Sequence, residues 1–294
     1  MTAPLSDRRI ILQRLIADAA QGHLQFQASA GVALRVRQAL DDPDLPLPTA
    51  TRLIQAEPVL AARVVAMANS VAFNRSGRTI DDVRSAVLRL GFRTLRALAT
   101  AFLVRQVGAG REDGDARRRA MAHQLWEHTA HVAALSRILA ARVTRVDPEL
   151  ALFAAIIHEI GGFYLLSRAE EYPALLDSDA AEWNEEDVMA LEIDLGRQVL
   201  QALGVPRTAT EAVEACWEGY LAIPPRTLGD TLLLADELAP VSSPLREAGL
   251  RRAQGDENGR SMATIEMLVD QETLSAILAE SREELASVTT ALQF

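Results

Sequence analysis

Residues 147–162 read Asp-Pro-Glu-Leu-Ala-Leu-Phe-Ala-Ala-Ile-Ile-His-Glu-Ile-Gly-Gly. This stretch begins like a helix, because Asp147 can cap the first turn and Pro148 fits its first position. The apolar run that follows indicates a buried helix, and the pair Gly161-Gly162 predicts its end. The run is much shorter than the ~20 residues that a membrane-spanning helix needs.

Helical spacing of apolar residues continues on both sides of this stretch. A long helix is expected from about Arg117 to Arg142, and Gly91 indicates a turn between two helices. Two earlier stripes comprise Leu53, Ile54, Leu60, Ala61, Val64, Val65 and Ala68, then Val83, Val87, Leu90, Leu95, Leu98 and Phe102. No stretch alternates as a strand does. The sequence therefore predicts an all-α protein, a compact two-lobed helical bundle with a C-terminal helical appendage.

Two polar segments with several glycines divide the chain, at residues 108–115 and 253–260. Such composition is typical of linkers or exposed loops. We expect a helical extension at 1–24, a domain at 25–240 with lobes at 25–107 and 115–240, and a helical tail at 241–294. Residues 262–292 are amphipathic and acidic, a pattern typical of internal packing or of docking to a partner or a second copy.

Composition limits the classes of function. The chain has 294 residues and a net charge of −10, which disfavours nucleic-acid binding because phosphates would be repelled. The single cysteine, Cys216, excludes an internal disulfide and a cysteine-rich zinc site, and we expect it to be a small buried hydrophobic residue. The N-terminus has no signal-peptide pattern, so a cytoplasmic protein is expected.

Five histidines are available for chemistry: His23, His123, His128, His131 and His158. On the long helix His128 shares one face with Val132 and Leu135, whereas His131 points roughly 300° further round at ~100° per residue. His128 is therefore expected to face inward. An inward histidine on an apolar face is either a hydrogen-bonded core residue or a ligand.

His158 and Glu159 are adjacent near the C-terminal end of the apolar helix. Burying an imidazole and a carboxylate is costly unless they are paired, hydrogen-bonded or bound to a cation. Adjacent helical positions diverge by ~100°, so both can reach one ion only at a helix end. The pair is thus either part of a cation site or a capped helix terminus.

Two groups of motifs carry a resemblance to known families. Trp126-Glu127-His128 followed by His158-Glu159-Ile160-Gly161 resembles the HD superfamily of metal-dependent phosphohydrolases. The segment from Glu57-Pro58 to Asn69-Ser70, and Ser85-Ala86 to Leu90-Gly91 after it, resemble the signature of the HDOD family, the HD-related output domains of bacterial signalling. The resemblance covers about residues 25–240. It implies a compact HD-like helical fold and a bacterial regulatory protein.

Carried over position by position, the resemblance implies a metal site formed by His128, His158, Glu159 and Asp236. Because Glu159 alters this ligand set, we expect the site to be degenerate and to hold no cofactor, and one divalent ion is the alternative. The resemblance also implies Asn69, Ser70, Leu90 and Gly91 as signature positions, where Asn69-Ser70 is expected to cap or turn between helices.

This chain departs from the catalytic pattern in three respects. Glu159 replaces the expected aspartate, Gly162 occupies the position of the catalytic family's lysine, and no histidine follows position 158. The sequence therefore favours a non-catalytic signalling domain over a metal-dependent phosphohydrolase, which is the alternative. The implied partners are a signalling protein or a nucleotide-like ligand, with a homodimer as a further expectation, and neither a membrane nor nucleic acid.

Overall fold

The computed structural model describes residues 8–24, 30–109, 115–176, 185–219, 222, 224–247 and 271–292. All regular elements of these residues are helical, as the sequence predicts. The α-helices of the N-terminal half are α1 (Arg8–Ala20), α2 (Ala30–Ala39), α3 (Leu47–Gln55), α4 (Pro58–Asn69), α5 (Val83–Ala109) and α6 (Ala116–Leu139). Those that follow are α7 (Pro148–Ile157), α8 (Ile160–Arg168), α9 (Glu185–Ala202), α10 (Arg207–Glu218), α11 (Leu228–Glu237), α12 (Pro244–Glu247), α14 (Gln271–Glu280) and α15 (Arg282–Leu292).

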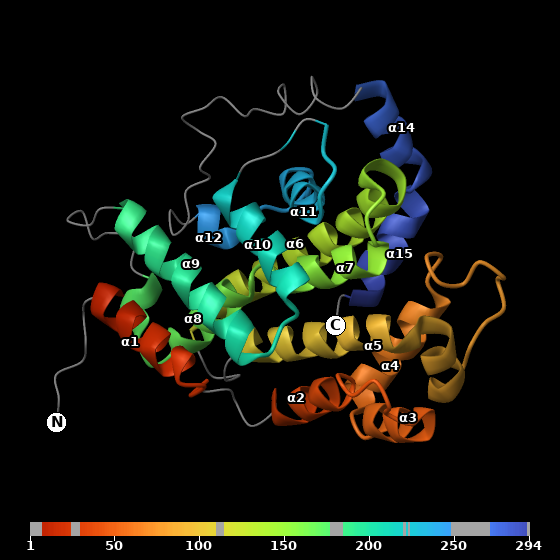
Figure 1. Ribbon diagram of the computed structural model, residues 1–294, viewed down its shortest axis with the longest axis horizontal. Helices are drawn as coiled ribbons and strands as arrows, with labels where there is room; N and C mark the ends of the chain where they lie inside the picture. The colour runs from red at the N-terminus through yellow and green to blue at the C-terminus, as the bar shows by residue number, and fades with distance from the viewer. Residues whose placement is uncertain are drawn as a thin grey trace.

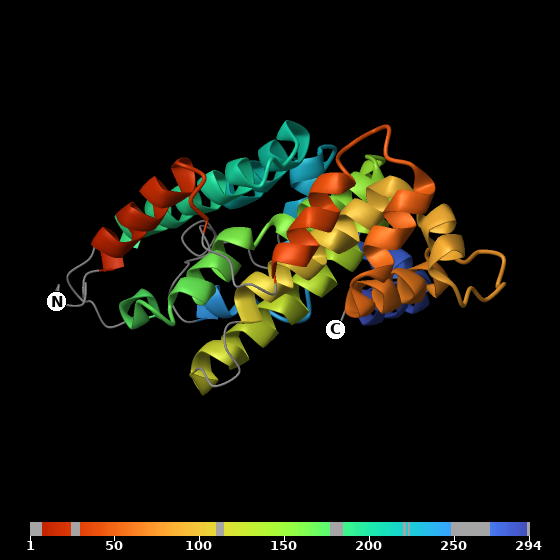
Figure 2. The same ribbon diagram turned by 90° about the horizontal axis from the view of Figure 1, so that it is seen from below.

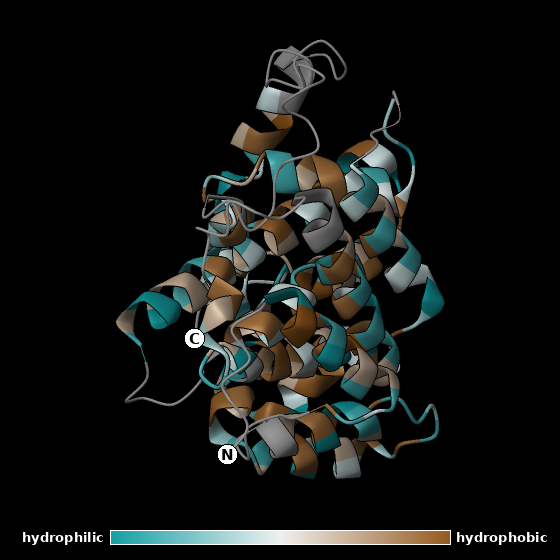
Figure 3. Ribbon diagram, turned by 90° about the vertical axis from the view of Figure 1, so that its left-hand side faces the viewer, coloured by the Kyte–Doolittle hydropathy of each residue, from teal (hydrophilic) through white to brown (hydrophobic). Residues whose placement is uncertain are grey.

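Helices α5, α6 and α7 lie at the centre of the molecule, and the other helices pack around them (Figure 1). Helices α2, α3 and α4 contact α5, whereas α8, α11 and α15 contact α6. In the second view α1 runs beside α9, with which it is in contact (Figure 2). Brown and teal residues occur together in many of the helices (Figure 3), and the apolar side chains form the buried core.

The long helix expected from Arg117 to Arg142 is α6, which continues as a π-helical turn over Ala140–Thr144. Arg145 then adopts a left-handed conformation with φ 60°, which ends the helix. The expected turn at Gly91 is also present, because Gly91 has φ 72° and ψ 166° inside α5 and divides that helix. Only glycine adopts this conformation without strain.

The prediction that Gly161-Gly162 ends a helix was wrong. Helix α7 ends earlier, at Ile157, and α8 begins at Ile160 and contains both glycines. The reason is close packing: a Cβ atom on Gly161 would lie 3.0 Å from the Cα of Gly196 on α9. These glycines therefore allow helices to approach one another rather than stopping one.

Residues 148–168 are long and apolar enough to cross a membrane by length and composition, but 89% of the most apolar window is buried inside the protein. That burial is typical of a core helix, and α7 and α8 are separate helices within it. Of the two expected polar breaks, residues 110–114 and 253–260 lie outside the described residues, whereas Gly108 and Ala109 still belong to α5.

Candidate metal centre

His128 projects from α6 into the core. Its exposed fraction is 0%, and Val132 and Leu135 on the same face are buried as well, which confirms the predicted orientation. The Nδ1 atom of His128 lies 2.8 Å from the carbonyl oxygen of Val241. Because a carbonyl can only accept, Nδ1 carries a hydrogen and donates it. The Nε2 atom therefore faces the interior of the site.

His158 lies at the corner between α7 and α8, where it caps the C-terminus of α7. Its Nδ1 atom is 2.5 Å from the carbonyl oxygen of Ala155, one turn earlier, and therefore donates to it. The backbone carbonyl of His158 accepts a hydrogen bond from Nε1 of Trp217 on α10, at 3.2 Å. The corner is thus held from two sides, and Nε2 of His158 points toward His128.

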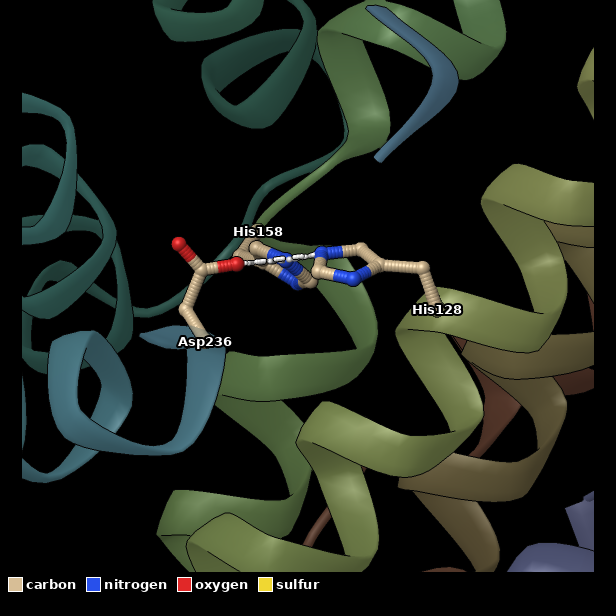
Figure 4. Close-up of side chains that lie close together, drawn as sticks. All are labelled: His128, His158 and Asp236. Carbon is tan, nitrogen blue, oxygen red and sulfur yellow. Dashed lines mark hydrogen bonds and ion pairs between the residues drawn. The ribbon is translucent and has the colours of Figure 1, made fainter. Parts of the chain in front are cut away.

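Asp236 comes from α11, and its side chain reaches the two imidazoles (Figure 4). Its Oδ1 atom lies 3.0 Å from Nε2 of His128 and 3.8 Å from Nε2 of His158. Helix α11 begins with a capping box in which Thr227 and Asp230 each accept from the other's backbone N–H. The side chains of His128, His158 and Asp236 are 1%, 4% and 2% exposed, so the cluster is closed to solvent.

The three inward-facing atoms are all potential acceptors. The two Nε2 atoms are 3.3 Å apart, and the ligand atoms of His128, His158 and Asp236 lie within 4.8 Å of one another. Two imidazole lone pairs and a carboxylate oxygen repel one another in a low-dielectric interior unless a proton or a cation lies among them. Two histidine nitrogens and one carboxylate are also a common ligand set for divalent transition metals. The residues present therefore fit a metal ion.

The two histidines respond differently to their surroundings. Burial acts to lower the pKa of His128, but the hydrogen bond and negative charge of Asp236 outweigh it, and this pKa lies above the ordinary value of 6.5. Burial also lowers the pKa of His158, and there the opposing charge of Glu159 is too weak to reverse the effect. The surroundings therefore favour the protonated form of His128 more than that of His158.

Glu159 lies next to this cluster but outside it. It is 3% exposed, and its carboxylate is not among the ligand atoms that gather within 4.8 Å. Instead, Oε2 of Glu159 lies 3.1 Å from the point where a Cβ on Gly162 would stand. Its charge nevertheless acts to raise the pKa of both histidines, although burial keeps that of His158 below its ordinary value. Of the four residues in the predicted metal set, the structure thus brings His128, His158 and Asp236 together.

The signature positions Asn69 and Ser70 organise the turn after α4. The side-chain amide of Asn69 donates to the carbonyl of Ile80 at 2.7 Å, and its Oδ1 accepts from the N–H of Ile80 at 2.8 Å. The hydroxyl of Ser70 donates to the carbonyl of Met67 at 2.7 Å. Leu90 is buried beside the kink at Gly91. These contacts confirm a turn-forming role for Asn69-Ser70.

Two kinds of contact at the site could not be found from the sequence. The carbonyls of Ala155 and Val241 orient the imidazoles, but any residue type offers a backbone carbonyl. Trp217 was missed because its contact partner, His158, lies far away in the sequence. Among the remaining candidates, Cys216 is buried as expected, and His23 and His123 are exposed.

These features define a class: an all-helical domain with two histidines and an aspartate, each from a different helix or helix end, at a buried centre. The family model of the HDOD domain matches residues 27–215. The chain therefore belongs to the HDOD domain family. No curated protein matches the chain in a sequence search.

Several solved structures share the fold. A protein from Shewanella amazonensis, named a putative metal-dependent phosphohydrolase, has a TM-score of 0.67 at 20% identity, over 98% of this chain and 100% of that one. An HDOD domain protein with unknown function from Geobacter sulfurreducens has a TM-score of 0.57 at 20% identity, over 97% and 98% of the two chains. A protein from Marinobacter aquaeolei, named a putative signal transduction protein, has a TM-score of 0.53 at 18% identity, over 99% and 68%. At these identities the likeness concerns the fold alone.

Proposed function

We propose that this protein is a non-catalytic regulatory HDOD domain that holds one divalent metal ion between His128, His158 and Asp236. In this proposal the ion fixes the relative positions of α6, the α7–α8 corner and α11. The domain acts in the cytoplasm by binding a signalling protein or a nucleotide-like ligand. The observation that carries the proposal is that the three ligand atoms converge in a site that is closed to solvent.

The geometry supports metal binding because both imidazoles are already oriented for it. Each Nδ1 atom is committed to a backbone carbonyl, so each Nε2 atom is directed to the same point as Oδ1 of Asp236. Such outer hydrogen bonds fix the tautomer and orientation of a ligand histidine. A bound divalent ion would compete with a proton for these three atoms.

The surroundings support a non-catalytic role. Hydrolysis of a phosphoester needs an open position for the substrate and groups that neutralise its charge. At the position of the catalytic family's lysine stands Gly162, and the methyl group of Leu245 lies where a side chain on it would begin. The chain contains no lysine at all. The Glu159 carboxylate beside Gly162 would also repel a phosphate.

The experiment is a metal analysis combined with a hydrolysis screen. The full chain is purified without chelator, its bound transition metals are quantified, and a panel of nucleotides and other phosphoesters is tested with the wild type and His158→Ala. We expect close to one ion per chain, its loss in His158→Ala, and no turnover in either protein. If the wild type contains no metal as purified and binds none when metal is added, the metal site is refuted.

The alternative function is a metal-dependent phosphohydrolase. It is favoured by the same ligand cluster, since a divalent ion there would polarise a phosphoryl oxygen and activate a water molecule. Turnover of a phosphoester that depends on the metal and disappears in His158→Ala would establish this alternative and overturn the non-catalytic proposal.

A further inference from the structure

The segment that follows α11 lies against α6 beside the metal ligands. We call residues 241–245 the cover segment. The carbonyl of Val241 accepts the hydrogen bond from Nδ1 of His128, and the carbonyl of Ser242 accepts one from the side chain of Gln124 at 3.2 Å. These two bonds attach the cover segment to α6 on either side of Leu125.

Leu245 fits into the space left by the absent side chain of Gly162. Its Cδ1 atom is 2.4 Å from the point where a Cβ on Gly162 would stand, and Leu245 is 2% exposed. A Cδ2 atom of Leu125 lies 3.4 Å from the same point. Leu125 is one turn before His128 on α6, and Gly162 is one turn after His158. The Leu245 side chain therefore packs between the two segments that carry the histidines.

Ser243 lies in the middle of the cover segment and makes the packed position of this segment against α6 less favourable. It is 0% exposed, and its hydroxyl has no hydrogen-bond partner among the described residues. A buried hydroxyl without a partner favours a state in which water can reach it. The two hydrogen bonds and the Leu245 side chain hold the cover segment in place, whereas the unpaired hydroxyl of Ser243 opposes this position.

We infer that the cover segment is a movable lid over the histidine–aspartate cluster, and that Leu245 is the residue that holds it shut. Opening would release Leu245 from Gly162, hydrate Ser243 and admit solvent to His128 and His158. Opening would also let a metal ion enter or leave the cluster, and this part of the inference rests on the proposed metal site. The opening itself does not depend on that site.

The test is chemical modification of the histidines in metal-free full-length protein. Diethyl pyrocarbonate modifies accessible neutral imidazoles, and mass spectrometry follows each of the five histidines separately. His23 and His123 are exposed and serve as internal standards in every sample. Because chelator is present throughout, the result does not depend on whether the protein binds metal, and failure of the lid can be told apart from failure of the metal site.

In the wild type we expect His128 and His158 to react much more slowly than His123. Leu245→Ala should accelerate both buried histidines by about tenfold or more, because less apolar contact opposes opening. Ser243→Ala should slow them, because it removes the unpaired hydroxyl from the closed position. The standards should react alike in all proteins. Leu60→Ala, which truncates a buried leucine of α4, controls for general loss of stability.

The lid is overturned if His128 and His158 react as fast as His123 in the wild type, or if Leu245→Ala accelerates them no more than Leu60→Ala does. It is also overturned if Ser243→Ala reacts faster than the wild type. Circular dichroism identifies an unfolded variant, and if Leu245→Ala is unfolded, Leu245→Val carries the same comparison with a smaller cavity. With metal added, release of the ion to a chelator should follow the same order of variants.

Discussion

The Nε2 atoms of His128 and His158 lie 3.3 Å apart while both Nδ1 atoms donate to backbone carbonyls. The two rings come from different helices, and neither can turn away without losing the hydrogen bond at its Nδ1 atom. Asp236 completes the set from α11. Folding therefore brings the three side chains together, each from a different segment of the chain.

Changing one ligand should weaken metal binding much more than changing a nearby histidine outside the cluster. His128→Ala and Asp236→Asn are each expected to weaken metal affinity by about 100-fold or more, because the first change removes a ligand and the second removes the negative charge of the site. His131→Ala on the same helix α6 is the control, since His131 does not belong to the cluster. Isothermal titration of metal-free protein measures the affinity. Equal losses in the control would show that the effect arises from the helix and not from the site.

Glu159 distinguishes the four-residue metal set that the sequence implies from the three residues that the structure brings together. Its carboxylate lies outside the ligand group, and its charge acts on both histidines. Glu159→Gln should therefore keep one ion per chain and change affinity far less than Asp236→Asn does. Loss of the ion in Glu159→Gln would show that the carboxylate turns toward the metal when it binds.

Much of this arrangement could be predicted from the sequence because it depends on local patterns. The inward direction of His128 follows from its spacing to Val132 and Leu135, and the start of α7 follows from Asp147-Pro148. The grouping of Asp236 with the histidines was implied only by the family resemblance. Nothing local to α11 indicates which of its residues meets a side chain of α6.

The failures of prediction arise where distant segments decide a conformation. Gly161-Gly162 has the composition of a helix end, but its neighbours Gly196 and Leu245 come from α9 and from the cover segment. Glu159 follows His158 directly, but the corner between α7 and α8 turns its side chain toward Gly162. Tertiary packing, which a pattern of one segment does not contain, overrides the local signal in both cases.

The two adjacent glycines should respond differently to alanine. A Cβ on Gly161 meets the backbone of Gly196, which cannot move aside, whereas a Cβ on Gly162 meets a methyl group of Leu245. We expect Gly161→Ala to lower the free energy of unfolding by about 1–3 kcal/mol and Gly162→Ala to lower it by less. Urea denaturation measures both. A Gly161→Ala variant as stable as the wild type would contradict the close approach of α8 and α9.

Arg137 should contribute more to stability than an exposed arginine does. Its guanidinium donates to Glu149 of α7 at 3.2 Å and to Glu284 of α15 at 2.5 Å, and it lies 4.7 Å from the ring centre of Phe73. Arg137→Met is expected to lower the free energy of unfolding by about 2 kcal/mol, because two partly buried carboxylates lose their partner.

The control for Arg137 is Arg207→Met, because Arg207 also pairs with a glutamate, Glu211, but is 90% exposed. That change should alter stability by less than about 0.5 kcal/mol. Similar effects of both changes in urea denaturation would contradict a role for Arg137 in attaching α15.

Asp230 should make stability depend on pH in the acidic range. Burial acts to raise the pKa of Asp230, but backbone hydrogen bonds from Arg226, Thr227 and Ala222 outweigh it and hold this pKa below its ordinary value of 3.8. The unfolded chain therefore binds a proton at higher pH than the folded chain, so the contribution is complete above pH 3.8 and disappears as pH falls through the depressed pKa.

Asp230→Asn is expected to cost about 1–2 kcal/mol at neutral pH. The difference between wild type and variant should shrink below pH 3.8 as Asp230 becomes protonated. Urea denaturation across this range measures it. A difference that stays constant down to the acid limit would show that the carboxylate charge is not what stabilises the start of α11.

Substitution of Asn69 should lower stability more than substitution of other residues in the turn after α4. Its amide donates to the carbonyls of Val65 and Ile80 and its oxygen accepts from the N–H of Ile80, so one side chain replaces three backbone partners. Asn69→Ala is expected to cost about 2 kcal/mol, because these partly buried backbone groups lose their partner. Asn69→Asp keeps the acceptor and loses both donors, so its cost should also be clear.

Ser76→Ala, on the exposed part of the same turn, is the control and should change stability by less than about 0.5 kcal/mol. Thermal and urea unfolding compare the three variants. If Asn69→Asp were as stable as the wild type, the donated hydrogen bonds would contribute nothing, and the asparagine of this signature would need an explanation outside the fold.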